Sequence, residues 1–158
     1  MVRGAFGIPT RGPGQLFIGP CPDPGALSDA VHALADDGIT TVISLLTPED
    51  VQTLGLEREE AHCAARGMAF VAAPIRDFGL PSADQVTWLQ SLIGGRLDAG
   101  DAVFVHCKAG IGRSGITACA VLVDRGHTPE AALKIVSAAR GRPVPDTPEQ
   151  RRFVLSLG

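Results

Sequence analysis

The segment Val103–Gly115 combines the side chains and the spacing that a phosphate-attacking cysteine needs. An apolar run ends in His106 and Cys107, and Arg113 and Ser114 follow after five intervening residues. The thiolate is the nucleophilic form of cysteine, and it forms readily near a helix N-terminus or a positive charge. Arg113 supplies the charge, and a helix is expected to begin directly after the loop. We therefore predict that Cys107 is a nucleophile.

The residues after Cys107 are also suited to holding a phosphate group; residues 107–113 are called the cysteine loop below. Glycines in the loop reach backbone conformations that other residues rarely adopt. Successive N–H groups and a helix start then converge on an anion such as phosphate, sulfate or vanadate, and the Arg113 fork grips two of its oxygens. Ser114 is expected to donate a hydrogen bond to the sulfur. The expected substrate-binding residues are Lys108, Ala109, Gly110, Ile111, Gly112 and Arg113.

The motif His106-Cys107-x5-Arg113-Ser114 resembles the HCx5R(S/T) signature of the cysteine-dependent protein tyrosine phosphatases. The resemblance runs in order from Gln15 to Phe153 and is similar to the dual-specificity branch, particularly compact cyclin-dependent-kinase-associated phosphatases. It implies a phosphomonoester hydrolase that forms a phosphocysteine, acts on phosphorylated protein or peptide, and needs no metal or other cofactor.

Transfer of phosphate to a thiolate leaves an oxyanion that a carboxylic acid on a second loop can protonate. The best candidate is Asp77, thirty residues before Cys107, in a Gly/Pro-rich loop after a predicted strand. The ends of parallel strands open on one sheet edge, and the segment is similar to the general-acid loop of dual-specificity phosphatases. A turn aspartate is the alternative. Weaker candidates lie in a helical turn or at the opposite sheet edge: Asp84, Asp98 and Asp101.

Three further positions each have a catalytic and a structural interpretation. In the phosphatases that the chain resembles, a late Thr-x-x-Gln segment carries a glutamine that positions water. Gln150 matches it, but Thr147-x-x-Gln150 is also a capping box. His106 either helps to keep Cys107 deprotonated or packs as a strand histidine. Arg140 and Arg142 either form a basic rim that contacts the substrate or simply lie at a solvent-exposed helix end.

Length, composition and net charge argue against several classes of protein. The chain has 158 residues, of which 45% are hydrophobic and 20% charged, which suits one folded domain. A net charge of −3 argues against a nucleic-acid partner. No apolar run approaches membrane-spanning length, and residues 1–15 lack the apolar stretch of a signal peptide. We expect a monomer with neither a nucleic-acid nor a membrane partner.

The four cysteines show neither a CxxC pair nor zinc-ligand spacing, which favours a cytoplasmic protein with free thiols. Cys119 is expected to pack as a small apolar residue in the helix after the loop. Cys21 or Cys63 would trap Cys107 as a disulfide under oxidation if either lay beside it, which the sequence leaves open.

Strands and helices alternate along the chain. The expected fold is therefore α/β, a single domain with a central, mainly parallel four- to five-stranded sheet flanked by helices, as in phosphotyrosine protein phosphatases. We expect a Gly/Pro-rich arm over residues 1–14 and a catalytic domain over residues 15–158. The predicted strands are 15–19, 39–46, 68–75 and 102–106. The predicted helices are 27–38, 47–67 with a break near Gly55, 82–97, a helix from the loop to 126, 129–140, and one from 148. Trp88 is expected in the core.

Three alternatives remain at this stage. Phosphoinositide phosphatases of the same superfamily can carry His-Cys-Lys-Ala-Gly, as here, but with a second lysine later in the loop, where this chain has Ile111. A sulfurtransferase or an arsenate reductase also uses a cysteine in an anion-binding loop, yet neither requires the combination of His106, Arg113, Ser114 and an upstream acid loop at Asp77. A non-catalytic phosphate-binding module would usually lack the cysteine or the acid.

Overall fold

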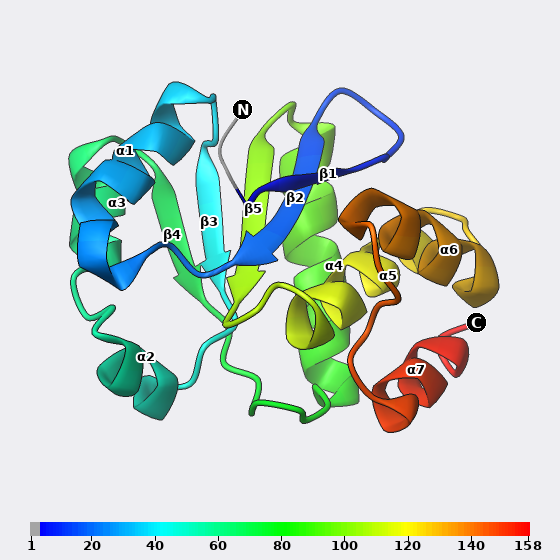
Figure 1. The fold of residues 1–158 in the computed structure, drawn as a ribbon. Helices are drawn as coiled ribbons and strands as arrows, with labels where there is room; N and C mark the ends of the chain where they lie inside the picture. The colour runs from blue at the N-terminus through cyan, green and yellow to red at the C-terminus, as the bar shows by residue number, and fades with distance from the viewer. Residues whose placement is uncertain (1–3) are drawn as a thin grey trace.

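A five-stranded sheet in the order β1-β2-β5-β3-β4 forms the centre of the computed structural model, which describes residues 4–158 (Figure 1). β1 runs antiparallel to β2 at one edge, and all other neighbours are parallel. The strands are β1 (Phe6–Ile8), β2 (Gln15–Pro20), β3 (Thr41–Ser44), β4 (Ala69–Ala72) and β5 (Ala102–Cys107). The predicted α/β fold with a mainly parallel sheet is confirmed.

Helices cover both faces of this sheet. They are α1 (Leu27–Asp36), α2 (Pro48–Leu54), α3 (Glu59–Ala65), α4 (Ala83–Asp98), α5 (Gly112–Asp124), α6 (Pro129–Arg140) and α7 (Pro148–Leu155), and a 3-10 turn, η1 (Pro24–Ala26), precedes α1. Helices α1 and α3 pack on one face, and α4 to α7 lie on the other (Figure 1). Each predicted helical region is present, and α2 ends at Gly55, which has a φ of 73°.

The central strand β5 is buried along its whole length, which explains its nearly unbroken apolar run. Its side chains alternate between two hydrophobic clusters. Phe104 packs with Val31 and Leu34 on the α1 and α3 side, whereas Val103 and Val105 pack on the side of α4 to α7. This alternation sends His106 and Cys107 toward opposite faces of the sheet.

Several boundaries differ from the sequence prediction. The arm predicted over residues 1–14 contains β1, a short edge strand that its Gly/Pro content concealed; residues 1–3 of that arm lie outside the described residues. Strands β3 and β4 are shorter than predicted, because only four residues of each pair in the ladder. The flanking chain stays extended: the N–H of Ile75 donates to the carbonyl of Leu45 at 2.9 Å.

The prediction for Trp88 was wrong. This side chain is 45% exposed, because the buried face of α4 follows a helical spacing that excludes it. The buried residues of that face are Val86, Leu89, Ile93, Gly94 and Leu97.

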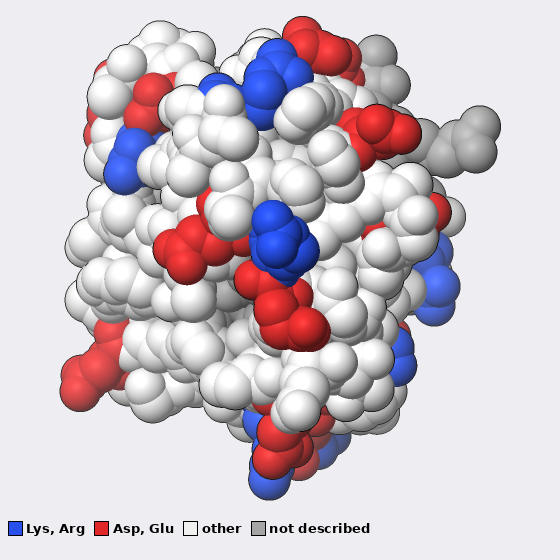
Figure 2. Space-filling view, turned by 90° about the vertical axis from the view of Figure 1, so that its left-hand side faces the viewer, with Lys and Arg blue, Asp and Glu red and all other residues white. Residues whose placement is uncertain are grey.

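The face formed by α1 and α3 carries separate acidic and basic groups among uncharged atoms, with no continuous field of either sign (Figure 2). Within residues 4–158, no helix combines the length and the apolar character that crossing a membrane requires. The same residues contain no group of three or more His, Cys, Asp or Glu side chains placed to hold a metal ion.

Candidate active site

The carboxyl end of β5 delivers Cys107 to the lower edge of the sheet in Figure 1, and α5 begins five residues later. Cys107 is 2% exposed, and its Sγ accepts a hydrogen bond from the N–H of Gly110 at 3.2 Å. Gly110 has a φ of 71°, and a Cβ there would lie 2.2 Å from the carbonyl carbon of Gly19. The loop therefore needs glycine at this position to curl back over the sulfur.

Arg113 lies in the first turn of α5 with 1% of its surface exposed. Its Nη1 donates to Asp50 Oδ2 at 2.7 Å and to the carbonyl of Ile75 at 2.9 Å. Among residues 4–158, the other two donor groups, Nε and Nη2, are buried and form no hydrogen bond, and Nη2 has only an ion pair with Asp77. Buried donors without hydrogen bonds are costly, so this side of the guanidinium is suited to an anion that presents two oxygens.

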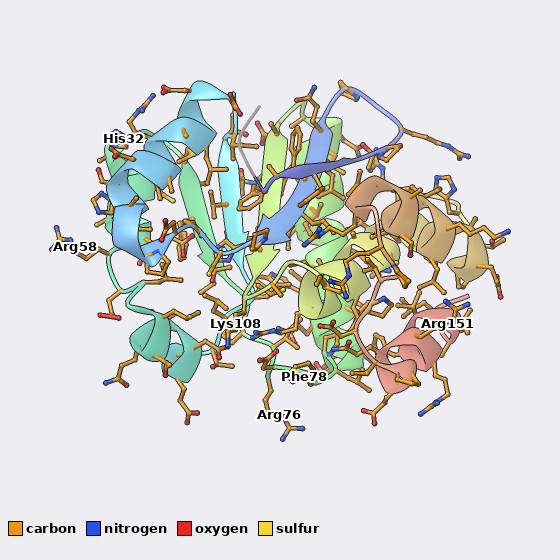
Figure 3. All side chains as sticks on the ribbon, in the orientation of Figure 1. His32, Arg58, Arg76, Phe78, Lys108 and Arg151 are labelled. Carbon is orange, nitrogen blue, oxygen red and sulfur yellow. The ribbon has the colours of Figure 1, made fainter. Side chains whose placement is uncertain are left out.

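Asp77 lies across from Arg113, as the sequence predicts for strand ends of a parallel sheet. Its Oδ1 is 3.2 Å from Arg113 Nη2 and accepts a hydrogen bond from the N–H of Phe78 at 3.1 Å. The side chain is 41% exposed, so it borders solvent as well as the site. Figure 3 shows Lys108 and Phe78 at this edge of the sheet, with Arg76 pointing away from the body of the protein.

A cavity of about 240 Å³ brings these groups together. Its lining residues are Asp77, Phe78, Cys107, Lys108, Ala109, Gly112, Arg113 and Asp146. The structure thus places the predicted nucleophile, arginine and acid around one space. The other predicted loop residues, Gly110 and Ile111, are buried behind it.

The weaker acid candidates lie elsewhere. Asp84 is exposed in the first turn of α4, Asp98 pairs with Arg125 at 2.9 Å, and Asp101 pairs with Arg96 at 3.7 Å. None of the three aspartates lines the cavity.

His106 is fully buried and lies between two acceptors. Its Nε2 is 2.6 Å from Glu59 Oε2, and its Nδ1 is 3.2 Å from the carbonyl oxygen of Cys107. Glu59 is 2% exposed and begins α3 on the opposite face of the sheet from the cavity. The histidine therefore braces the backbone of the nucleophile from behind, which gives the structural-support interpretation a specific partner.

Asp50 is a site residue that the sequence analysis missed. Burial opposes ionisation of its carboxyl, but hydrogen bonds from Arg113 and from the N–H of Thr47 hold its pKa below the ordinary value. Asp50 also closes a capping box with Thr47 at the start of α2. This capping role alone accounts for an aspartate at position 50. Nothing in the sequence therefore indicated that Asp50 also binds Arg113.

Arg140 fits neither of its two sequence interpretations. Its Nε donates to the carbonyl of Gly110 at 3.0 Å, its Nη2 donates to the carbonyl of Ala109 at 3.1 Å, and its guanidinium lies 4.0 Å from the ring centroid of Phe6. Burial, and the charge of Arg142, lower the pKa of Arg140. Because Arg140 binds the loop carbonyls on the outside, the N–H group of Gly110 is left facing the sulfur.

Gln150 is fully buried and forms the predicted capping box with Thr147. Its Oε1 accepts from the N–H groups of Asp146 and Thr147, and its Nε2 donates to the carbonyl of Gly79 at 3.3 Å. Gln150 therefore ties α7 to the loop that carries Asp77, and it does not line the cavity.

The remaining predicted groups behave differently from one another. The Ser114 hydroxyl is buried and has no hydrogen-bond partner among residues 4–158, so it does not form the expected bond to the sulfur. All four cysteines are free, and Cys119 is buried in α5 as expected. Cys63 packs in the cluster on the opposite face of the sheet from Cys107. The backbone N–H of Cys21 donates to the carbonyl of Lys108 at 3.2 Å, so Cys21 adjoins the cysteine loop.

This site on this fold defines a class, the cysteine-dependent phosphatases of the dual-specificity type. A protein-family profile described as "Polymorphic toxin system, DSP-PTPase phosphatase" matches residues 22–127. The chain belongs to that family and is a phosphatase. No curated protein sequence matches it.

Several solved structures share the fold. The kinase associated phosphatase KAP, with its catalytic cysteine replaced by serine, is 17% identical with a TM-score of 0.88, covering 95% of this chain and 90% of that one. A glycine-to-alanine mutant of Tk-PTP is 27% identical with a TM-score of 0.79, covering 99% and 95%. Human DUSP28 is 25% identical with a TM-score of 0.60, covering 89% and 88%.

Proposed function

We propose that the chain removes phosphate from phosphorylated proteins or peptides through a phosphocysteine on Cys107. The observation that carries this proposal is the Arg113 guanidinium, which lines the same cavity as Cys107 and whose buried Nε and Nη2 form no hydrogen bond among residues 4–158; Nη2 has only its ion pair with Asp77. A phosphoryl group with two oxygens against Nε and Nη2 satisfies both donors, and the loop amides serve the remaining oxygens.

In the first step, the Cys107 thiolate attacks phosphorus while Arg113 and the loop N–H groups stabilise the charge on the equatorial oxygens. The bond between phosphorus and the leaving oxygen breaks, and Asp77 donates a proton to that oxygen. Asp77 suits this role because it borders both solvent and the cavity. His106 and Arg140 act as positioning residues, since their contacts are to the backbone of the loop.

In the second step, water attacks the phosphocysteine and Asp77, now a carboxylate, accepts a proton from it. The bond between sulfur and phosphorus breaks, and its electron pair returns to Cys107 as thiolate. Gln150 contributes by holding the Asp77 loop through Gly79. Neither step as proposed calls on a metal or an organic cofactor.

The proposed substrate follows from the walls of the cavity. Phe78 is 63% exposed, and it stands with Lys108 at an opening that borders solvent. Such an opening suits phosphoserine and phosphothreonine as well as phosphotyrosine on an exposed segment. Lys108 is the single lysine of the loop, and Ile111 is buried where a second lysine would bind a polyphosphorylated lipid head group.

Phosphate, sulfate and vanadate are proposed to bind the same loop. The proposal also includes a monomer working in the cytoplasm, where the four free thiols of Cys21, Cys63, Cys107 and Cys119 would stay reduced.

The test is a panel of kcat/KM values on phosphotyrosine, phosphoserine and phosphothreonine peptides and on phosphoinositides. We expect turnover of the peptides to exceed that of the lipids. Cys107→Ser should abolish turnover and retain vanadate or phosphopeptide binding. Preference for the lipids would overturn the substrate proposal, and near-normal turnover by Cys107→Ser would overturn the mechanism.

A further inference from the structure

A second cavity, of about 780 Å³, lies between α1 and the carboxyl end of β2, and it is called the α1 groove below. Its volume is within the range of ligand-binding pockets. Leu34 and Phe104, two buried residues of the hydrophobic cluster beneath α1, form part of its lining. None of its lining residues also lines the active-site cavity, so the α1 groove is a separate feature.

Small side chains explain why this space is not filled. Ala26, Ala30 and Ala33 follow one another at spacings of four and three residues, so they lie on one face of the helical segment. All three line the α1 groove, and Pro20 and Pro22 line it from the end of β2. The walls are therefore largely apolar and leave room for a side chain from a ligand.

The charged groups of the α1 groove have one sign. Among residues 4–158, its charged lining residues are all aspartates: Asp23, Asp29, Asp36 and Asp37. Asp36 pairs with Arg66 at 2.7 Å, whereas the exposed Asp29 has neither a hydrogen bond nor an ion pair among the same residues. Complementary charge attracts a partner and like charge excludes one, so the groove favours a ligand that joins an apolar group to a cation.

The α1 groove adjoins the cysteine loop. Pro20 lies opposite Cys107 in the ladder between β2 and β5, and the N–H of Cys21 donates to the carbonyl of Lys108 at 3.2 Å. Pro20 and Cys21 line the groove, while Cys107 and Lys108 line the active-site cavity. Figure 1 shows the carboxyl ends of β2 and β5 at the same edge of the sheet. One polypeptide is therefore able to occupy both sites.

We propose that the α1 groove binds a segment of the phosphorylated protein substrate in which an apolar side chain adjoins lysine or arginine. This inference rests on the function proposed above. The apolar side chain enters between α1 and the end of β2, and the cation lies beside Asp29. Binding of this segment raises the effective concentration of the phosphorylated residue at Cys107. It takes no part in the chemical step, so it lowers KM and leaves kcat unchanged.

The first measurement is fluorescence anisotropy with a labelled, unphosphorylated peptide that contains a leucine between two arginines. We expect binding that weakens as salt is added and that falls about tenfold in Asp29→Lys, which turns attraction into repulsion. Ala33→Leu fills the groove and should weaken binding at least as much. Glu60→Lys is the matched control, because Glu60 is an exposed acid in the first turn of α3 and does not line the groove. It should bind the peptide as the wild type does.

The second measurement compares two phosphotyrosine peptides, one of them joined to the same leucine-and-arginine segment through flexible linkers of increasing length. At the best length, the joined peptide should have a KM about tenfold lower in the wild type, with an equal kcat. Asp29→Lys and Ala33→Leu should remove this difference and still hydrolyse a small aryl phosphate at the wild-type rate, which shows that both variants are folded.

Equal affinity of Asp29→Lys and Glu60→Lys for the labelled peptide would overturn the inference. Self-association of the chain that Asp29→Lys abolishes in sedimentation would also overturn it, because the groove would then belong to a second copy. If the wild type turns over neither phosphopeptide, the proposed function fails, and the anisotropy measurement still decides whether the groove binds the segment.

Discussion

Replacing Arg140 tests whether the cysteine loop is held in shape from outside. Arg140→Ala removes two hydrogen bonds from a charged donor to the carbonyls of Ala109 and Gly110. Bonds to charged groups contribute about 1.5–3 kcal/mol each. The bond to Ala109 is exposed and the bond to Gly110 is half-buried, so water would replace part of each bond. We therefore take about 1 kcal/mol for each bond and about 2 kcal/mol in total. If the whole amount holds the loop in its anion-binding form, affinity for vanadate falls about 30-fold.

The assay is the equilibrium dissociation constant for vanadate, measured beside kcat and KM on a peptide substrate. Arg140→Lys retains the charge but loses the planar fork, so it should keep one of the two bonds and bind vanadate about fivefold more weakly than the wild type. Arg142→Ala is the control, because Arg142 contributes charge next to Arg140 and, among residues 4–158, forms no hydrogen bond with the loop carbonyls that Arg140 binds.

Two results would refute the reasoning. The first is vanadate binding within about twofold of the wild type in Arg140→Ala. The second is an equal loss in Arg140→Ala and Arg142→Ala, which would mean that Arg140 acts by charge alone and not by holding the loop carbonyls.

Three further outcomes follow from buried groups. Glu59→Ala should lower the free energy of unfolding by about 1–3 kcal/mol in urea denaturation, because it leaves the Nε2 atom of His106 buried without its hydrogen-bond partner; an unchanged midpoint would contradict this. The pKa of Asp50 is lowered in the folded protein, so its contribution to stability is present at neutral pH and lost as the pH falls through the folded pKa. The destabilisation of Asp50→Asn should therefore be largest near pH 7 and shrink below about pH 4; a constant difference across that range would show that the charge of Asp50 is irrelevant. Burial raises the pKa of Cys63 and Cys119 to about 12, so iodoacetamide at pH 7 should leave both unmodified in the folded protein, and peptide mass spectrometry would detect the contrary.

The sequence predicted the meeting of Cys107, Arg113 and Asp77 because that meeting depends on topology. Residues that follow parallel strands reach one sheet edge whatever the details of side-chain packing. The fold class was predictable for the same kind of reason, since buried strands and capped helices leave local signals. The edge strand β1 leaves a weaker local signal, because three residues between Gly/Pro-rich stretches are too few to show the alternating apolar pattern of a strand.

The supporting residues were not predictable, because their roles depend on contacts between distant elements. Glu59 reaches His106 across 47 positions of the chain, and Asp50 reaches Arg113 across 63. Both acids lie in the first turn of a helix, where acidic residues are common for local reasons. Arg140 ends α6, where a basic residue is equally ordinary, and only the packing of α6 beside the cysteine loop gives it the two carbonyls.

The most direct test of the account is to trap the covalent intermediate. The enzyme is mixed with a phosphotyrosine peptide, quenched in denaturant and digested, and the peptides are examined by mass spectrometry. The account predicts one added phosphoryl group on the peptide that contains Cys107, and none on that peptide in Cys107→Ser. A phosphoryl group on another residue, or steady turnover with no modification of Cys107, would contradict it.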